Sequence, residues 1–277
     1  MSTSPKPRWH NAVSGCIAGA GARLVVAPLD LIRIRLQLEP NKTILAHVQQ
    51  VATESGLRGF FRGNVPATYL WVGYSAVQFS FYAQFSEILN NMAVNKSTTA
   101  FCSGALAGVA ATLATYPFDI CRTNFAAAST GPKTMLDFAR DMHRLQGFRG
   151  FFAGVVPGLY GIVPYMGFNF LIYETLVGER TSANAGMAGA ISGGTSKLLV
   201  YPLDTVKKRL QVQAFSSERV RYKSMADCFV KILREEGFVS LYRGILPSVM
   251  KNMIATSLSF ALYIFAQNTL TSLSTTS

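Results

Sequence analysis

A six-residue motif, Pro-x-Asp-x-x-basic, occurs three times in the chain and constrains its fold more than any other feature. The copies begin at Pro28, Pro117 and Pro202, so 89 and then 85 residues separate them. Each copy follows an apolar run and precedes, at a similar distance, an aromatic-x-Gly sequence and a further proline. Three copies in register indicate internal repetition. We therefore expect three similar units with pseudo-three-fold symmetry, covering residues 1–95, 96–181 and 182–277.

The composition indicates that these units lie in a membrane. Hydrophobic residues make up 49% of the chain and charged residues only 14%, whereas soluble domains carry about 25% charged residues. Six apolar stretches reach the length of about 20 residues that crosses a bilayer. They lack the period-two alternation of barrel strands, which favours helices and an all-α membrane protein. The expected spans, two per repeat around a central cavity, are 11–38, 65–91, 97–126, 155–178, 184–213 and 245–270.

Short amphipathic segments separate the paired spans, and we expect them to lie flat on one membrane surface as helices. They cover residues 44–53, 134–145 and 223–235. Together with the adjoining helix ends they place 19 of the 26 lysine and arginine residues on one side. Because such basic segments face the negative compartment, both termini are expected on the opposite face. The same placement argues against a nucleic-acid partner, since the charge decorates a membrane interface rather than an exposed aromatic groove.

The sequence offers no obvious catalytic or metal centre. The four cysteines lack Cys-x-x-Cys spacing, so neither a disulfide framework nor a zinc site is expected. The three histidines lie at a terminus and in surface segments, and the expected spans contain no Ser-His-Asp set. A membrane enzyme is the competing functional class, but we expect no enzymatic activity, no metal and no cofactor.

The repeated motif places a carboxylate and, one turn later, a cation beside a proline. A proline inside a helix kinks its axis, so Pro28, Pro117 and Pro202 allow three helices to converge at one end of the bundle. Charges at membrane depth are costly unless paired, and each acid of a three-fold bundle reaches the base of a neighbouring helix. We predict a ring of breakable interhelical ion pairs, with three intrahelical pairs as the alternative. The ring residues are Asp30, Arg33, Asp119, Arg122, Asp204 and Lys207, and Gln37 and Gln211 are expected to brace them.

The third repeat carries a longer pattern in full. This pattern reads Pro202-x-Asp204-x-x-Lys207-x-Arg209, and then Glu236-Gly237-x-x-x-x-Tyr242-Arg243-Gly244. On this pattern and its two less complete copies, the chain resembles the mitochondrial carriers along essentially its whole length. The departures from the family pattern are Ser55 before Gly56, Gln146 before Gly147, Asn124 in place of the second base, and Ala153 before Gly154.

The resemblance implies an alternating-access solute carrier of the inner mitochondrial membrane. Such a carrier acts as a monomer, has both termini toward the intermembrane space and uses the ion-pair ring as its matrix gate. By analogy the pairs are Asp30 with Arg122, Asp119 with Lys207, and Asp204 with Arg33. The exchange of charges in one pair, Asp30→Lys with Arg122→Asp, should then restore more activity than either single change. The resemblance also implies that cardiolipin binds near Gly63, Gly154 and Gly244.

The second gate of the family, on the cytoplasmic side, requires an aromatic-acid-x-x-base sequence on each even-numbered span. In this chain the pattern is eroded, because only one acid and none of the bases remain. We expect a weak outer gate in which tyrosines and hydrogen bonds replace ion pairs. The gate positions are Tyr82, Tyr173, Glu174, Tyr263 and Gln267.

Three further cations lie within the expected spans and outside both gates. Arg23 and Lys197 each precede a motif proline by five residues, and Lys251 follows Gly244 by seven. Intramembrane cations mark functional sites by default, although any single one could instead extend to the interface. Three cations without an unpaired acid predict a multiply charged anion, such as a phosphoester, as the substrate.

The remaining candidate residues indicate a substrate with an aromatic part. Gly161 and Ile162 occupy the central contact position of the family on the fourth span and resemble carriers of nucleotide-like molecules, while Tyr165 is suited to stacking. Thr68, Leu70 and Gln78 are neutral where many adenine-nucleotide carriers have an arginine. Asn64, Thr68 and Gln78 are expected to contact the aromatic part of the substrate. We expect an aromatic, phosphorylated substrate other than ordinary ATP, exchanged for a phosphate-bearing anion. The alternatives are another nucleotide-like anion, of the adenine nucleotide or coenzyme A type, or a non-transporting membrane receptor or structural protein.

Overall fold

The computed structural model describes residues 8–91, 95–128, 134–177, 185–215 and 221–275, and all of its regular elements are helices. The six long helices are α1 (Arg8–Leu38), α3 (Asn64–Asn91), α4 (Lys96–Ala127), α6 (Val155–Val177), α7 (Ala185–Gln213) and α9 (Ile245–Thr275). The short helices are α2 (Ile44–Gly59), α5 (Met135–Gln146) and α8 (Met225–Glu235), with 3-10 turns η1 (Gly147–Phe152) and η3 (Phe238–Tyr242). The three-repeat helical organisation expected from the sequence is confirmed.

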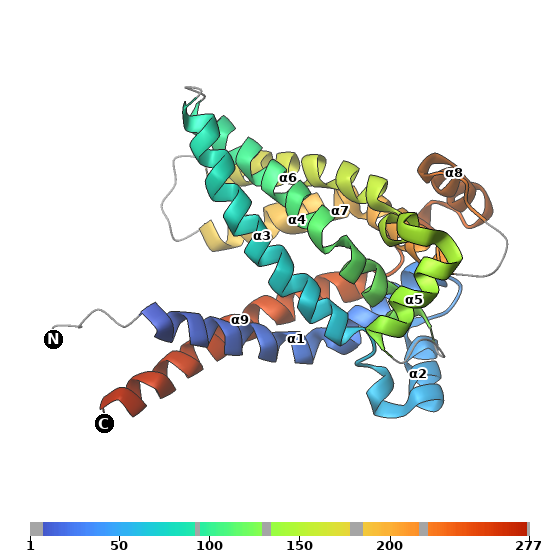
Figure 1. Ribbon diagram of the computed structural model, residues 1–277, viewed down its shortest axis with the longest axis horizontal. Helices are drawn as coiled ribbons and strands as arrows, with labels where there is room; N and C mark the ends of the chain where they lie inside the picture. Colours follow the sequence, from blue (N-terminus) through green and yellow to red (C-terminus); the bar gives the residue numbers. More distant parts are fainter. Residues whose placement is uncertain (1–7, 92–94, 129–133, 178–184, 216–220, 276–277) are drawn as a thin grey trace.

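The long helices pack most extensively between repeats, not within them. The main pairs are α3 with α4, α6 with α7, and α9 with α1, so each second span of a repeat covers the first span of the next one. Figure 1 shows the free ends of α1 and α9 at one end of the molecule and α2, α5 and α8 at the opposite end. The bundle is therefore closed by contacts between neighbouring repeats, with one face of every pair turned to the centre.

The three short helices are built alike. Each begins at a hydroxyl side chain that accepts a hydrogen bond from a backbone N–H in the first turn, which caps the helix. These caps are Thr43, Thr134 and Ser224. Each helix buries a pair of residues four positions apart on one face, and α2 also buries Gly59 at its end. The buried pairs are His47 and Val51, Phe138 and Met142, and Cys228 and Ile232.

A glycine with positive φ starts each second span of a repeat and rests on the neighbouring repeat. A Cβ atom added to Gly63 would lie 2.8 Å from the carbonyl oxygen of Arg122. The equivalent atoms at Gly154 and Gly244 would lie 2.9 Å from the carbonyl oxygens of Lys207 and Arg33. The three contacted residues are the ring cations, so these glycines hold the base of every second span against the ring.

The motif prolines lie inside helices, as predicted: Pro28 in α1, Pro117 in α4 and Pro202 in α7. By hydropathy and length alone, two stretches of the described residues suffice to span a membrane, Thr98–Ala127 and Met135–Tyr173. Helices α1 and α7 carry several charged residues, which lowers their mean hydropathy.

Candidate gate and substrate cavity

The three predicted interhelical ion pairs are all present in the structure. Arg122 of α4 binds Asp30 of α1. Lys207 Nζ lies 2.8 Å from Asp119 Oδ2, and Arg33 Nη2 lies 3.3 Å from Asp204 Oδ2. These pairs join α1, α4 and α7 in a closed ring. Asp30 and Asp119 are buried, and the alternative of three intrahelical pairs is not adopted.

Each ring acid also binds at least one further cation, which corrects one expectation from the sequence. Lys251 Nζ lies 3.1 Å and Arg23 Nη2 lies 3.5 Å from the Asp30 carboxylate, and Lys197 binds Asp204. These three cations were expected outside both gates, but all of them contact ring acids. For Arg23 and Lys197 the physical reason is helical periodicity, because a residue seven positions before another lies on the same helix face, two turns away. Lys251 instead reaches Asp30 from α9, which packs against α1. The cavity cations and the gate therefore form one electrostatic network.

The corner at Asp119 has a cation that the sequence motif does not indicate. Lys208 Nζ lies 2.9 Å from Asp119 Oδ1 and also donates hydrogen bonds to Thr123 and Gln211. The Gln211 side chain donates to Asp119 Oδ2 over 3.0 Å, the contact expected of a brace. The Gln37 side chain is buried, but its amide has no hydrogen-bond partner among the described residues. Bracing is thus visible at one corner and not at the corner of Gln37.

Two tyrosines support the ring, and sequence analysis missed both. Lys207 Nζ lies 5.0 Å from the ring centroid of Tyr116, and Arg33 Cζ lies 5.6 Å from that of Tyr201, within the range of cation–π attraction. Their hydroxyl groups donate to the carbonyl oxygens of Ala153 and Arg243. Each tyrosine directly precedes a motif proline, and this shared position could have identified both tyrosines from the sequence. The first repeat has Ala27 there.

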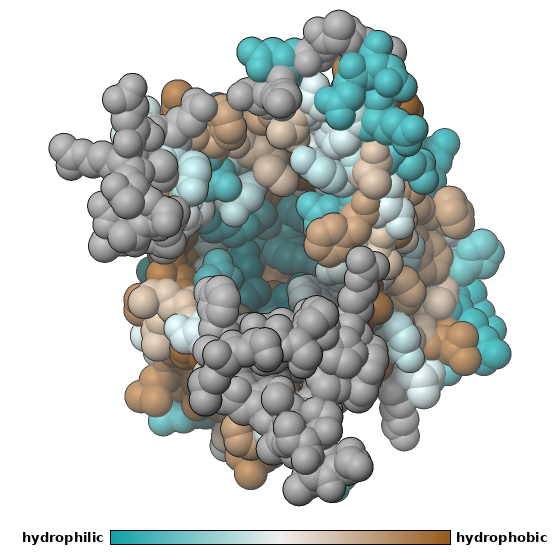
Figure 2. All heavy atoms as spheres, turned by 90° about the vertical axis from the view of Figure 1, so that its left-hand side faces the viewer, coloured by the Kyte–Doolittle hydropathy of each residue, from teal (hydrophilic) through white to brown (hydrophobic). Residues whose placement is uncertain are grey.

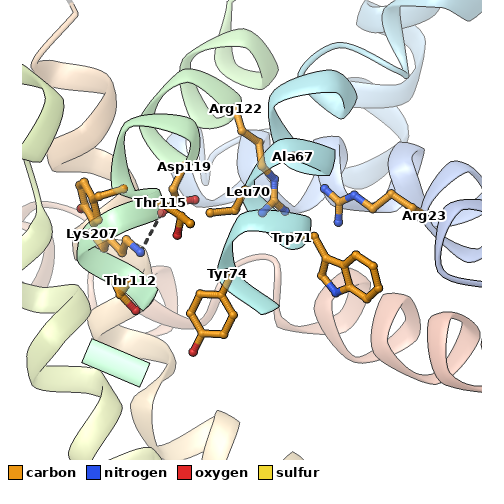
Figure 3. A pocket seen from close by; sticks show the side chains of 11 residues that line it. Arg23, Ala67, Leu70, Trp71, Tyr74, Thr112, Thr115, Asp119, Arg122 and Lys207 are labelled. Atoms are coloured by element: carbon orange, nitrogen blue, oxygen red, sulfur yellow. Dashed lines mark ion pairs between the residues drawn. The ribbon is translucent and has the colours of Figure 1, made fainter. Parts of the chain in front are cut away.

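Two cavities lie beside the ring, on the side of the bundle where α1 begins and α9 ends. One has a volume of about 250 Å³ and is lined by Arg23, Trp71, Tyr74, Thr112 and the ring residues Asp119, Arg122 and Lys207, among others. Figure 3 shows Arg23 and Arg122 reaching this space from different helices, beside Trp71 and Tyr74 of α3. Figure 2 shows that this end of the molecule is hollowed, with hydrophilic residues in the depression. The ion-pair ring closes the inner end of this depression, its floor, and the outer end, its mouth, is open.

The second cavity has a volume of about 370 Å³ and collects most of the predicted substrate contacts. Its lining includes Gly161, Ile162, Tyr165, Lys197, Lys251 and Asp204, together with Tyr74 and Asn252. Asn64, Thr68 and Gln78, three neutral residues of α3, line neither of these two cavities. Asn64 instead lines a small pocket of about 10 Å³ beside Asp30 and Arg122. The face of α3 that lines the cavity of about 250 Å³ carries Ala67, Leu70, Trp71 and Tyr74, and Thr68 instead donates its hydroxyl to the Asn64 carbonyl oxygen.

The outer gate is described only in part. Tyr82 is 40% exposed, and Tyr173 lies near Gly189 of α7, where an added Cβ atom would be 3.9 Å from its ring. The side chains of Glu174, Tyr263 and Gln267 lie outside the described residues. Among the described residues, neither Tyr82 nor Tyr173 forms a hydrogen bond across the mouth, which agrees with the open depression in Figure 2.

Below the ring, an ion pair ties the end of α7 to α8 and η3. Arg209 Nη1 and Nη2 lie 2.5 and 2.6 Å from the Glu236 carboxylate oxygens, and Ser240 donates to the same carboxylate over 2.6 Å. Burial alone would raise the pKa of Glu236, but the hydrogen bonds from Arg209 and Ser240 outweigh it and hold that pKa below its ordinary value. In the first repeat Ser55 takes the place of Glu236, and Arg35, the counterpart of Arg209, instead pairs with Glu54 over 3.9 Å.

A third cavity, of about 750 Å³, lies outside the ring where the first and second repeats meet. It is lined by Gly63, Arg58, Arg62 and several apolar side chains, including Phe61, Val65 and Met135. Two arginines beside an apolar wall are suited to a molecule with an anionic head and a hydrocarbon body.

The comparisons with known proteins agree with this architecture. The family model described as mitochondrial carrier protein matches residues 4–93, 94–178 and 178–274. The mitochondrial thiamine pyrophosphate carrier of Bos taurus is 35% identical over 285 residues, which cover 91% of this chain and 90% of the relative. The corresponding proteins of Pyricularia oryzae and Homo sapiens are each 33% identical, over 91% and 95% of this chain and 89% and 95% of their own lengths.

The likeness to these particular carriers is also predicted by local segments, such as 72–79 on α3 and 201–212 on α7, and the comparisons confirm it. The relatives are transporters rather than enzymes. Three matched repeats, an interhelical ion-pair ring at the motif prolines and a central cavity together show that the chain belongs to the mitochondrial carrier family.

Proposed function

We propose that the protein transports thiamine pyrophosphate across the inner mitochondrial membrane into the matrix, in exchange for a nucleotide or another phosphate-bearing anion. The observation that carries the proposal is the convergence of Arg23, Lys197 and Lys251 on the cavity floor, in a chain whose relatives bear the name of this carrier. A pyrophosphate group is a multiply charged acceptor that three such cations can bind together.

The geometry supports a direct link between binding and gate opening. The three cavity cations are engaged by ring acids in the structure, so an incoming pyrophosphate competes with Asp30 and Asp204 for them. Loss of these partners weakens the ring, because each ring acid then retains fewer cations. The substrate can thereby stabilise a state in which the floor opens and the mouth closes, as alternating access requires.

The uncharged part of the substrate has a place in the larger cavity. Gly161 leaves space beside Ile162, and Tyr165 presents an aromatic face. A pyrimidine ring can stack there, while the thiazolium cation is repelled by the basic floor and attracted to aromatic faces.

The setting of the carrier follows from the same resemblance. The protein acts as a monomer through its central cavity and has both termini in the intermembrane space. Cardiolipin binds beside Gly63, Gly154 and Gly244, and the cavity lined by Arg58 and Arg62 supports this role for the first of these positions. The chemistry of transport requires neither a cofactor nor an enzymatic step.

Two other functions remain as outcomes of the test. A carrier of adenine nucleotides or coenzyme A would use the same cations and the slot at Gly161. A receptor or structural role is disfavoured, because a protein that does not open has no need for three breakable ion pairs at membrane depth.

A thermal-shift screen of the detergent-purified protein separates these outcomes, since a ligand that binds only the folded state raises the apparent stability. Thiamine pyrophosphate should raise the melting temperature more than thiamine, thiamine monophosphate, ATP, ADP or coenzyme A. Stabilisation by adenine nucleotides or coenzyme A alone would overturn the substrate and leave the carrier fold in place.

A further inference from the structure

We propose that Tyr74 is a specificity-determining residue, which together with Tyr165 binds the ring portion of the substrate between two aromatic side chains. This inference rests on the proposed function and deepens it, because it places the two ends of the substrate in the cavity. Tyr74 lies in the segment 72–79 that resembles these carriers, but the sequence analysis assigned it no contact with the substrate.

The repeat register identifies the pair. Tyr74 follows Gly63 by eleven residues, and Tyr165 follows Gly154 by eleven, so the two tyrosines occupy equivalent positions on α3 and α6. The third equivalent position, eleven residues after Gly244, is Ala255 on α9. The equivalent position therefore carries an aromatic side chain in two repeats and a small side chain, one turn after Lys251, in the third.

The structure brings Tyr74 to the meeting point of the cavities. Among the described residues, only Tyr74 lines both the cavity of about 250 Å³ and the cavity of about 370 Å³. Tyr165 lines the larger of the two. A Cβ atom added to Gly108 of α4 would lie 3.6 Å from the Tyr74 hydroxyl oxygen and 3.7 Å from Ile162 Cγ2. The Tyr74 side chain thus extends across α4 toward the contact position on α6.

The distribution of charge gives the orientation of the substrate. The cations Arg23, Lys197 and Lys251 come from α1, α7 and α9, whereas the tyrosines come from α3 and α6. In Figure 3 the Tyr74 ring hangs into the pocket from α3, apart from the guanidinium groups of Arg23 and Arg122. A molecule with an anionic tail and a cationic aromatic ring satisfies both sides at once when its tail meets the cations and its ring meets the tyrosines.

The test compares two ligands that share the anionic group and differ in the ring. Uptake of labelled thiamine pyrophosphate into liposomes gives its KM, and inhibition by inorganic pyrophosphate gives a Ki. The ratio of Ki to KM measures how much the ring contributes to binding. In Tyr74→Leu this ratio should fall by about 5- to 30-fold, the effect of losing one cation–π contact. The Ki of pyrophosphate should stay within about twofold, and Tyr74→Phe should retain most of the ratio.

The control is Tyr160→Leu, because Tyr160 is an exposed tyrosine of α6 that lines neither cavity. It should keep the ratio of the unsubstituted protein. If Tyr74→Leu does not fold, Tyr74→Met keeps the side-chain volume without the aromatic face and should show the same fall. An unchanged ratio in the Leu or Met variant, with thiamine pyrophosphate uptake present in the unsubstituted protein, would overturn this inference alone. Absence of uptake by the unsubstituted protein would overturn the proposed function and this inference with it.

Discussion

Lys251 Nζ on α9 lies 3.1 Å from Asp30 Oδ1 on α1, although 221 positions separate the two residues in the chain. The contact joins a cation of the substrate cavity to an acid of the gate, and it also joins the last transmembrane helix to the first. Asp30 additionally binds Arg122 and Arg23, so its carboxylate is shared by three helices. Removal of one of these partners should affect both binding and gate closure.

Removal of the Lys251 ammonium should therefore abolish most transport without unfolding the protein. A charge-assisted contact to an anion contributes about 1.5–3 kcal/mol, so Lys251→Ala should lower kcat/KM by at least about tenfold. Stabilisation by thiamine pyrophosphate in a thermal-shift assay should be lost in parallel. Lys231→Ala is the matched control, because Lys231 pairs with Asp227 on the surface of α8. Transport by Lys251→Ala at the level of the unsubstituted protein would refute the pyrophosphate site.

Exchange of the charges of Asp30 and Arg122 should fail to restore transport, contrary to the expectation from sequence. In the double variant Asp30→Lys with Arg122→Asp, the new lysine would lie beside Arg23 and Lys251, and like charges at this distance repel each other. We expect the double variant to be no more active than Asp30→Lys alone in liposome uptake. Recovery to more than about a third of normal activity would show that the pair is independent of the two cavity cations.

A methyl group at Gly154 should destabilise the junction between α6 and α7. The added Cβ atom would lie 2.9 Å from the carbonyl oxygen of Lys207, and the backbone there has a φ of 74° that other residues rarely adopt. Clash and strain together should cost about 1–3 kcal/mol, seen as a lower melting temperature in detergent. Gly167→Ala within α6 is the control, since an added Cβ atom there meets nothing within 4 Å. Equal melting temperatures for the two variants would contradict the close approach.

The pair of Arg209 and Glu236 should make stability depend on acidic pH. Because the pKa of Glu236 is lowered in the folded protein, its contribution is fully present above the ordinary value of 4.5 and is lost as the pH falls through the folded value. Glu236→Gln should lower the melting temperature at pH 7 and have progressively less effect below pH 4.5. Glu235→Gln serves as the control, because Glu235 is half exposed at the surface. A difference that is constant with pH would show that ionisation of Glu236 does not contribute.

The ring could be predicted from the sequence because the motif repeats in register. Three acids and three bases at fixed offsets from Pro28, Pro117 and Pro202 predict a ring of ion pairs between helices. The resemblance to the mitochondrial carriers implies which acid pairs with which base, and the structure adopts those pairs. The glycines Gly63, Gly154 and Gly244 follow the same register, because each lies against the backbone carbonyl oxygen of one ring cation.

Contacts outside the motif could not be predicted in the same way. Lys208 occupies a variable position of the motif, and its approach to Asp119 depends on the rotation of α7 against α4. Arg23 and Lys197 each precede a ring acid by seven positions on the same helix, so their contacts could have been predicted from spacing. The contact of Lys251 with Asp30 could not, because it depends on how α9 packs against α1. Thr68 was expected at the substrate cavity but does not line it, because it lies one position along α3 from the cavity-lining Ala67 and therefore faces another direction.

The most direct test of the central claim is uptake of labelled thiamine pyrophosphate by liposomes that contain the purified protein. Vesicles loaded with unlabelled thiamine pyrophosphate, or with a nucleotide, should accumulate the label faster than empty vesicles, because the account requires exchange through one central cavity. The Lys251→Ala variant should lack this accumulation under the same loading. No accumulation above protein-free vesicles, even with thiamine pyrophosphate inside, would contradict the proposed function.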